Sequence, residues 1–112
     1  MDTTRQQKIS KLIQKELSEV LQKEGPNIYS SAMVTITRVE VTKDLAYARV
    51  YLSIFAVKDK QQVFAAIENK EKDLRFKLGQ KVKNQLRVVP ALTFVFDDTL
   101  DYLENIDKLL KS

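Results

Sequence analysis

Apolar and polar residues alternate most regularly over residues 46–54. The apolar positions are Ala46, Ala48, Val50, Leu52 and Ile54. The positions between them hold Tyr47, Arg49, Tyr51 and Ser53. A period of two places successive side chains on opposite faces of a β-strand. We therefore predict a strand with one buried face and one face that is largely exposed to water.

The preceding apolar run, residues 33–41, predicts a second strand with an irregularity. Its apolar residues change parity along the run: Val34 and Ile36, then Val39 and Val41. This change indicates either a strand covered on both faces or a β-bulge near Thr37 and Arg38. Residues 42–44 are too polar to be buried, so the two strands are expected to form an antiparallel hairpin around them.

Three further segments carry apolar residues at every third or fourth position, which predicts amphipathic helices. The first covers residues 4–23, and Gly25-Pro26 is expected to end it. The second covers residues 61–70, and the third covers residues 71–87 before Pro90 stops it. The predicted buried positions are Ile9, Leu12, Ile13, Leu17, Val20, Leu21, Val63, Phe64, Ile67, Leu74, Leu78, Val82 and Leu86.

Residues 91–96 predict the last strand, with Leu92, Phe94 and Phe96 on one face. The order is therefore helix, strand, strand, helix, helix, strand, which indicates an α+β fold. Residues 98–112 follow as an acidic amphipathic tail with apolar residues at helical spacing. We expect this additional C-terminal helix to dock on the body or on a partner, and a disordered tail is the alternative.

The residue types that are absent exclude most catalytic and metal chemistry. The 112 residues include no His and no Cys, so the usual general base, nucleophile pairs, thiolate ligands and disulfides are missing. Asp97, Asp98 and Asp101 form the one carboxylate group that could hold a divalent ion, but helix capping is the simpler interpretation. We predict a protein that is not an enzyme and uses no cofactor or metal.

Charge is distributed unevenly along the chain. Residues 97–112 carry five acids and two bases, a net charge of −3, which leaves +7 on residues 1–96 of the total of +4. A basic body is typical of proteins that bind polyanions, although many basic domains bind no nucleic acid. No apolar run approaches the roughly 18 residues of a membrane span, so we expect one soluble, cytoplasmic domain.

Residues 70–87 hold the densest group of positive charges, against only two acids, Glu71 and Asp73. The seven cations are Lys70, Lys72, Arg75, Lys77, Lys81, Lys83 and Arg87. Either a solvated helix face or a nucleic-acid contact explains such a cluster. Phe76 lies off the apolar stripe of the third helix, so it either stacks on a base or packs against the tail, and packing is the favoured interpretation.

Two stretches resemble the ribosome-binding factor A family. Residues 34–55, VTITRVEVTKDLAYARVYLSIF, are similar to its hairpin of the form VT-x-T-x-VEVS-x-DL-x-x-A-x-VYVS. Residues 74–102, LRFKLGQKVKNQLRVVPALTFVFDDTLDY, are similar to a helix with an R-x-x-LG segment, followed by a basic stretch, VP-x-L-x-F and an acidic end. The resemblance extends from the first helix to Tyr102.

The resemblance implies a type II KH-like domain, here residues 1–97, and a noncatalytic factor. Such a factor binds the small (30S) ribosomal subunit, assists late maturation of its 16S rRNA and is associated with growth in the cold. We expect a monomer with no membrane or small-molecule partner. The predicted RNA-binding residues are Arg38, Lys43, Lys70, Lys72, Arg75, Lys77, Lys81, Lys83 and Arg87. One alternative is a protein-interaction module that docks a partner through its tail helix and does not bind RNA. The other is a hydrolase that uses Asp97, Asp98 and Asp101 with a metal.

The sequence departs from the family between the second and third helices. Many members carry an Ala-x-Gly kink there, and the matching positions here are Lys70, Glu71 and Lys72. None of these residues readily accepts a positive φ. We therefore predict a smoother helical joint, at which side-chain charges, and not exposed backbone amides, would meet phosphate.

Overall fold

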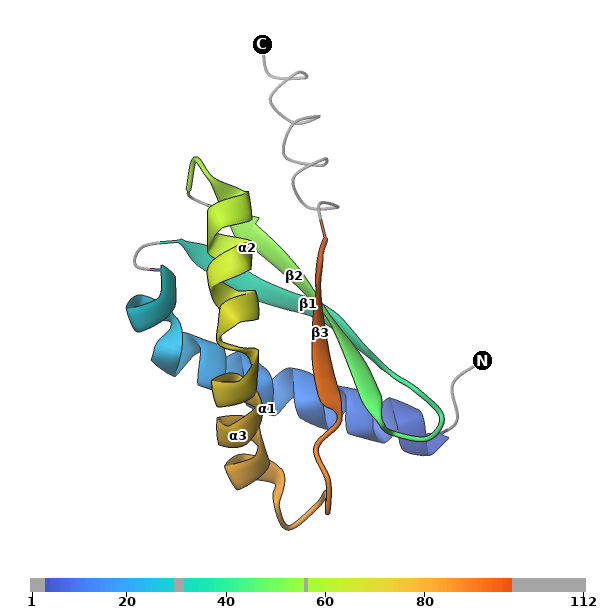
Figure 1. Ribbon diagram of the computed structural model, residues 1–112. Helices are drawn as coiled ribbons and strands as arrows, with labels where there is room; N and C mark the ends of the chain where they lie inside the picture. The colour runs from blue at the N-terminus through green and yellow to red at the C-terminus, as the bar shows by residue number, and fades with distance from the viewer. Residues whose placement is uncertain (1–3, 30–31, 56, 98–112) are drawn as a thin grey trace.

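The computed structural model describes residues 4–29, 32–55 and 57–97 (Figure 1). The elements of this part of the chain are α1 (Thr4–Tyr29), β1 (Met33–Val41), β2 (Tyr47–Phe55), α2 (Lys60–Asn69), α3 (Glu71–Val82) and β3 (Ala91–Phe96). Their order confirms the predicted α+β, type II KH-like arrangement. The expected C-terminal helix falls in residues 98–112, outside the described residues.

The sheet has the strand order β1-β2-β3, with β1 antiparallel and β3 parallel to β2. Its register shifts between Ile36 and Arg38, which confirms the predicted bulge. Because the bulge inserts one residue, Ile36 before it and Val39 after it both reach the buried face. The side chain of Gln14 on α1 donates to the Ile36 carbonyl at 3.3 Å, beside the bulge.

The core lies between one face of the sheet and the three described helices. Ala48, Val50, Leu52 and Ile54 are all fully buried, as the predicted alternation of β2 requires, whereas Ala46 is exposed and Ser53, predicted on the wet face, is buried. Tyr47 and Arg49 on the opposite face are exposed. Phe64 of α2 is only partly buried and meets the ring of Phe96 edge-on, with 6.1 Å between the ring centres. The face of the sheet that carries Tyr47 and Arg49 is left uncovered at the start of β2.

Helix α1 continues through Gly25-Pro26 to Tyr29, so the predicted end of this helix is wrong. Proline has no N–H to donate, which normally ends a helix. The Tyr29 hydroxyl folds back along the helix and donates to the Leu21 carbonyl at 3.2 Å, across the turn that contains Pro26. Gly25 makes room for this ring, since a Cβ at this position would overlap with the Tyr29 hydroxyl. This hydrogen bond within α1 thus spans the Gly25-Pro26 step.

We expect Tyr29→Phe to lower the free energy of unfolding by about 1 kcal/mol, because it removes this hydrogen bond. Burial raises the pKa of Tyr29 above its ordinary value of 10.0. Its contribution is therefore complete below pH 10.0 and is lost as the pH rises through the higher pKa of the folded state. Urea unfolding of the wild type and of Tyr29→Phe at pH 7 and at pH 11 checks this. If the free energy of unfolding falls equally in both proteins between the two pH values, the loss does not come from Tyr29 and the prediction is wrong.

Helices α2 and α3 are separated by one residue, Lys70, whose φ is −102°. Its amide donates to the Ile67 carbonyl at 3.0 Å, and its carbonyl accepts from the Leu74 amide at 2.9 Å. The backbone groups at the break are thus bonded within the helices. In Figure 1 α3 continues α2 along a similar direction. These features agree with the predicted smooth joint.

Helix α3 ends at Val82, one turn before the predicted end of its apolar stripe at Leu86. The amides of Gln85 and Leu86 both donate to the Val82 carbonyl at 2.8 Å, which closes the helix in a tight turn. Residues 83–90 then run back along α3, and the buried Pro90 leads into β3. This return segment is a connection that the helical periodicity did not predict.

Candidate nucleic-acid interface

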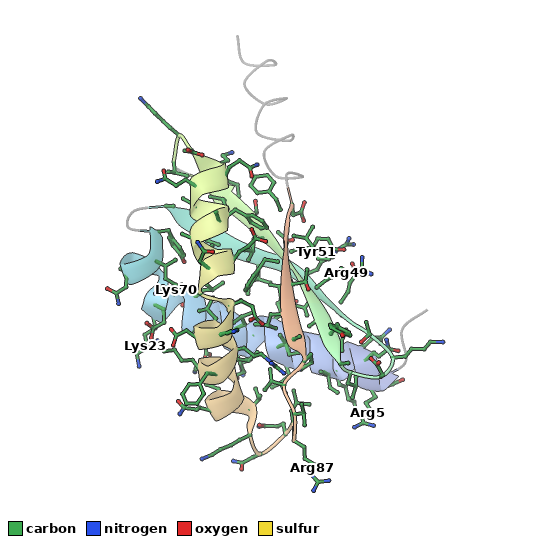
Figure 2. All side chains as sticks on the ribbon, in the orientation of Figure 1. Arg5, Lys23, Arg49, Tyr51, Lys70 and Arg87 are labelled. Atoms are coloured by element: carbon green, nitrogen blue, oxygen red, sulfur yellow. The ribbon has the colours of Figure 1, made fainter. Side chains whose placement is uncertain are left out.

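The nine cations predicted to bind RNA lie in two separate regions. Seven lie on α3, at its start or on the return segment, whereas Arg38 lies on β1 and Lys43 in the hairpin turn. Figure 2 shows Lys70 at the α2–α3 joint, and Arg49 and Tyr51 on the other side of β3. Arg38 belongs to that second region, since its guanidinium lies 4.1 Å from the centre of the Tyr51 ring. The structure therefore does not bring Arg38 together with the α3 cations.

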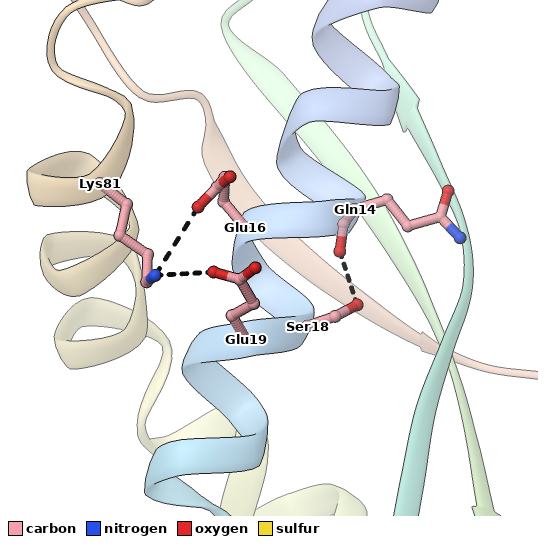
Figure 3. Close-up of polar contacts among 5 residues, drawn as sticks. All are labelled: Gln14, Glu16, Ser18, Glu19 and Lys81. Carbon is pink, nitrogen blue, oxygen red and sulfur yellow. Dashed lines mark hydrogen bonds and ion pairs between the residues drawn. The ribbon is translucent and has the colours of Figure 1, made fainter.

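Two of the α3 cations face α1 and are paired with its acids. Lys77 Nζ lies 3.0 Å from Glu24 and 3.1 Å from Asp73. Lys81 Nζ lies 2.8 Å from Glu19 and 3.7 Å from Glu16, as Figure 3 shows. The positive charges of both lysines are therefore partly neutralised by these acids, and the ion pairs join α3 to α1.

The ionisation of these groups reflects the pairing. Hydrogen bonds to Glu24 and then to Asp73 raise the pKa of Lys77. A hydrogen bond to Glu19 raises the pKa of Lys81, and the same bond lowers the pKa of Glu19. The attraction between the helices is therefore present at neutral pH and is lost when Glu19 is protonated in acid or the lysines lose their protons in alkali.

Arg75 is held by the backbone of the return segment. Its Nε and Nη2 atoms donate to the Val89 carbonyl at 3.1 and 2.6 Å. One turn earlier, the Glu71 carboxylate accepts from the Leu92 amide at 3.1 Å. Both contacts join α3 to the chain that leads into β3. Arg75 thus fixes the return segment, a role that its charge alone did not predict.

The remaining cations of this region are exposed and carry no ion pair within the described residues. They are Lys70, Lys72, Lys83 and Arg87. Lys72 and Lys83 line a cavity of about 510 Å³ between α3 and the return segment. We call this cavity the α3 groove, and its lining residues are Lys72, Arg75, Phe76, Gly79, Gln80, Lys83 and Val89. Three of these residues are cations and none is an acid, so the groove favours an anionic ligand.

Two apolar side chains near the groove are exposed. Phe76 is 65% exposed and Val88 is 72% exposed. The partner predicted for Phe76, the tail, lies outside the described residues. An exposed aromatic ring beside cations is a feature that single-stranded nucleic-acid sites share. The signal in the sequence was the position of Phe76 off the apolar stripe.

The carboxylate group at the end of β3 is only partly described. Asp97 accepts a hydrogen bond from the Thr37 hydroxyl at 2.7 Å, so the bulge of β1 and the end of β3 are tied together. Asp98 and Asp101 lie outside the described residues. Within the described ranges, no three acidic, His or Cys side chains gather in a way that could hold a metal ion. Among the described helices, none combines the length and apolar content that a membrane span needs.

Comparison with known proteins identifies the family. The family model for ribosome-binding factor A matches residues 5–110. The chain belongs to the ribosome-binding factor A family. Ribosome-binding factor A of Flavobacterium psychrophilum is 42% identical over 111 residues, which cover 98% of this chain and 85% of that protein.

Solved structures of ribosome-binding factor A have the same fold. The crystal structure of the Thermus thermophilus protein gives a TM-score of 0.66 at 22% identity, covering 80% of this chain and 93% of that one. A homology model of the Thermus protein, fitted into a cryo-EM map of its complex with the 30S subunit, gives a TM-score of 0.61 at 24% identity. The match covers 77% of this chain and 88% of that model. At these identities the likeness establishes the KH-like fold.

Proposed function

We propose that this chain binds the small (30S) ribosomal subunit in the cytoplasm and assists late maturation of its 16S rRNA. The observation that carries the proposal is the match to the ribosome-binding factor A model over residues 5–110. The Thermus member, which was fitted into a complex with the 30S subunit, supports the choice of partner. In this role the protein acts as a monomer and by binding alone, without catalysis.

We further propose that the RNA contact is made by the exposed cations around the α3 groove. Lys72 and Lys83 line the groove, and Lys70 and Arg87 lie at the two ends of this region. Lys77 and Lys81 are paired with acids of α1, so bringing phosphate to them would require those ion pairs to be broken. Arg38 and Lys43 stay candidates for a separate contact at the hairpin.

Two double variants with the same loss of charge test this assignment. Lys72→Gln with Lys83→Gln removes two groove cations, and Lys77→Gln with Lys81→Gln removes the two paired ones. We expect only the first to weaken binding to purified small subunits strongly. Its plot of log affinity against log salt concentration should be shallower by about two, because each lost phosphate contact reduces the slope by about one.

The control variant should keep the salt slope of the wild type while its thermal stability falls, because Glu16, Glu19 and Glu24 lose their partners. Co-sedimentation at several salt concentrations measures binding, and thermal unfolding measures stability. Equal changes of slope in both variants would show that only the overall charge matters. Salt-independent binding that both variants retain would favour the protein-interaction alternative.

A further inference from the structure

Phe76 lies on a stripe of α3 that faces away from the core. The buried stripe of this helix is Leu74, Leu78 and Val82. Lys72, Phe76 and Gly79 follow one another at spacings of three or four residues on the opposite stripe, and Lys83 follows at the same spacing just after the helix ends. Burial therefore does not account for an aromatic residue here. An isolated exposed aromatic needs no explanation, but this one lines a cavity whose other wall is the return segment.

The spacing along α3 places Phe76 between two cations. Lys72 is one turn before it, about 6 Å along the helix axis, and Lys83 is two turns after it, about 10 Å along the axis. Gly79 lies between Phe76 and Lys83, and a Cβ at this position would make an ordinary van der Waals contact with Val89 Cγ2 at 3.4 Å. The groove thus offers one flat apolar surface with a positive charge on each side.

We infer that the α3 groove receives one unpaired RNA base, which stacks on the Phe76 ring, with the adjacent phosphates near Lys72 and Lys83. The inference rests on the proposed function and deepens it, since it specifies unpaired RNA as the ligand of this site. In a double helix both faces of a base are covered by its neighbours, so duplex RNA has no free face to present. An apolar protein segment fits less well, because it would leave Lys72 and Lys83 of the lining without anionic partners.

A tryptophan placed at this position would report stacking directly, since the chain has no Trp of its own. We would titrate Phe76→Trp with a single-stranded RNA oligonucleotide and with a duplex of the same sequence. Stacking on a base is expected to quench the fluorescence with the single strand and not with the duplex. Tyr47→Trp is the matched control, because Tyr47 is 58% exposed on the uncovered face of the sheet.

Truncation provides a second measurement that does not depend on the fluorophore. We expect Phe76→Ala and Phe76→Leu to weaken single-strand binding roughly 5- to 150-fold, the range that corresponds to loss of one stacked base. Phe76→Tyr should retain affinity, and the salt slope should stay unchanged in all three variants. Thermal unfolding should also be unchanged, since the ring is exposed.

The outcomes separate this inference from the proposed function. Salt-dependent RNA binding that persists without quenching of Phe76→Trp, and without loss in Phe76→Ala, overturns the stacking inference alone. Quenching of Tyr47→Trp instead would assign the base to the uncovered face of the sheet and also overturn it. If the wild type binds neither RNA nor small subunits, the proposed function fails and the stacking inference fails with it.

Discussion

Leu78→Ala is expected to lower the free energy of unfolding by about 2–5 kcal/mol, the range for buried leucines. Leu78 has no exposed surface and lies at the centre of the buried stripe of α3, between Leu74 and Val82. Alanine would lose the burial of the removed carbons and leave a cavity that the surrounding helices and sheet cannot fully close. Domains of this size are stable by only about 5–15 kcal/mol, so the variant would approach the limit of folding.

Phe76→Ala provides the control for this prediction on the same helix. It removes a larger side chain two residues away, yet from a position that is 65% exposed. We expect a change within about 0.5 kcal/mol, as for ordinary surface substitutions. Urea unfolding of the two variants measures both effects. Similar losses would mean that Phe76 is buried in solution, which would also remove the ring from the proposed RNA site.

The features that could be predicted from the sequence depend on local periodicity. The period of two identified β2, and the change of parity in the strand before it correctly indicated a bulge. The spacing of Leu74, Leu78 and Val82 identified the buried face of α3. In each case the side-chain pattern within one element determines which side faces the core, so no knowledge of distant residues was needed.

Other features of the structure depend on contacts that the local patterns do not contain. Helix α1 passes Gly25-Pro26, and the Tyr29 hydroxyl donates across this step to the Leu21 carbonyl, a contact that the breaker signal Gly-Pro does not contain. Their charge placed Lys77 and Lys81 among the predicted RNA-binding residues, but the sequence could not show that acids of α1 face them. Their pairing depends on how α1 and α3 cross, which is a property of the packed core. Positive charge along the sequence therefore does not show which of these cations are paired within the fold.

Arg75 tests whether a cation of α3 binds RNA or supports the fold. The sequence predicts an RNA contact for it, and the structure shows that it donates to the Val89 carbonyl. We expect Arg75→Ala to lower the free energy of unfolding by about 2 kcal/mol, the usual contribution of hydrogen bonds from a charged donor. Arg75→Lys should recover only part of it, because an ammonium cannot reproduce the two bonds that the planar guanidinium makes.

RNA binding should weaken in both Arg75 variants, because the return segment that carries Lys83, Arg87 and Val88 would no longer be held against α3. Lys72→Ala is the control, since it removes an exposed cation of the same groove and should leave stability within about 0.5 kcal/mol. Urea unfolding and salt-dependent binding to small subunits distinguish the two roles. If Arg75→Ala keeps full stability and its salt slope falls by about one, then Arg75 contacts phosphate as its charge predicts. If the free energy of unfolding of Arg75→Ala falls strongly in the absence of RNA, then Arg75 acts instead by shaping the α3 groove.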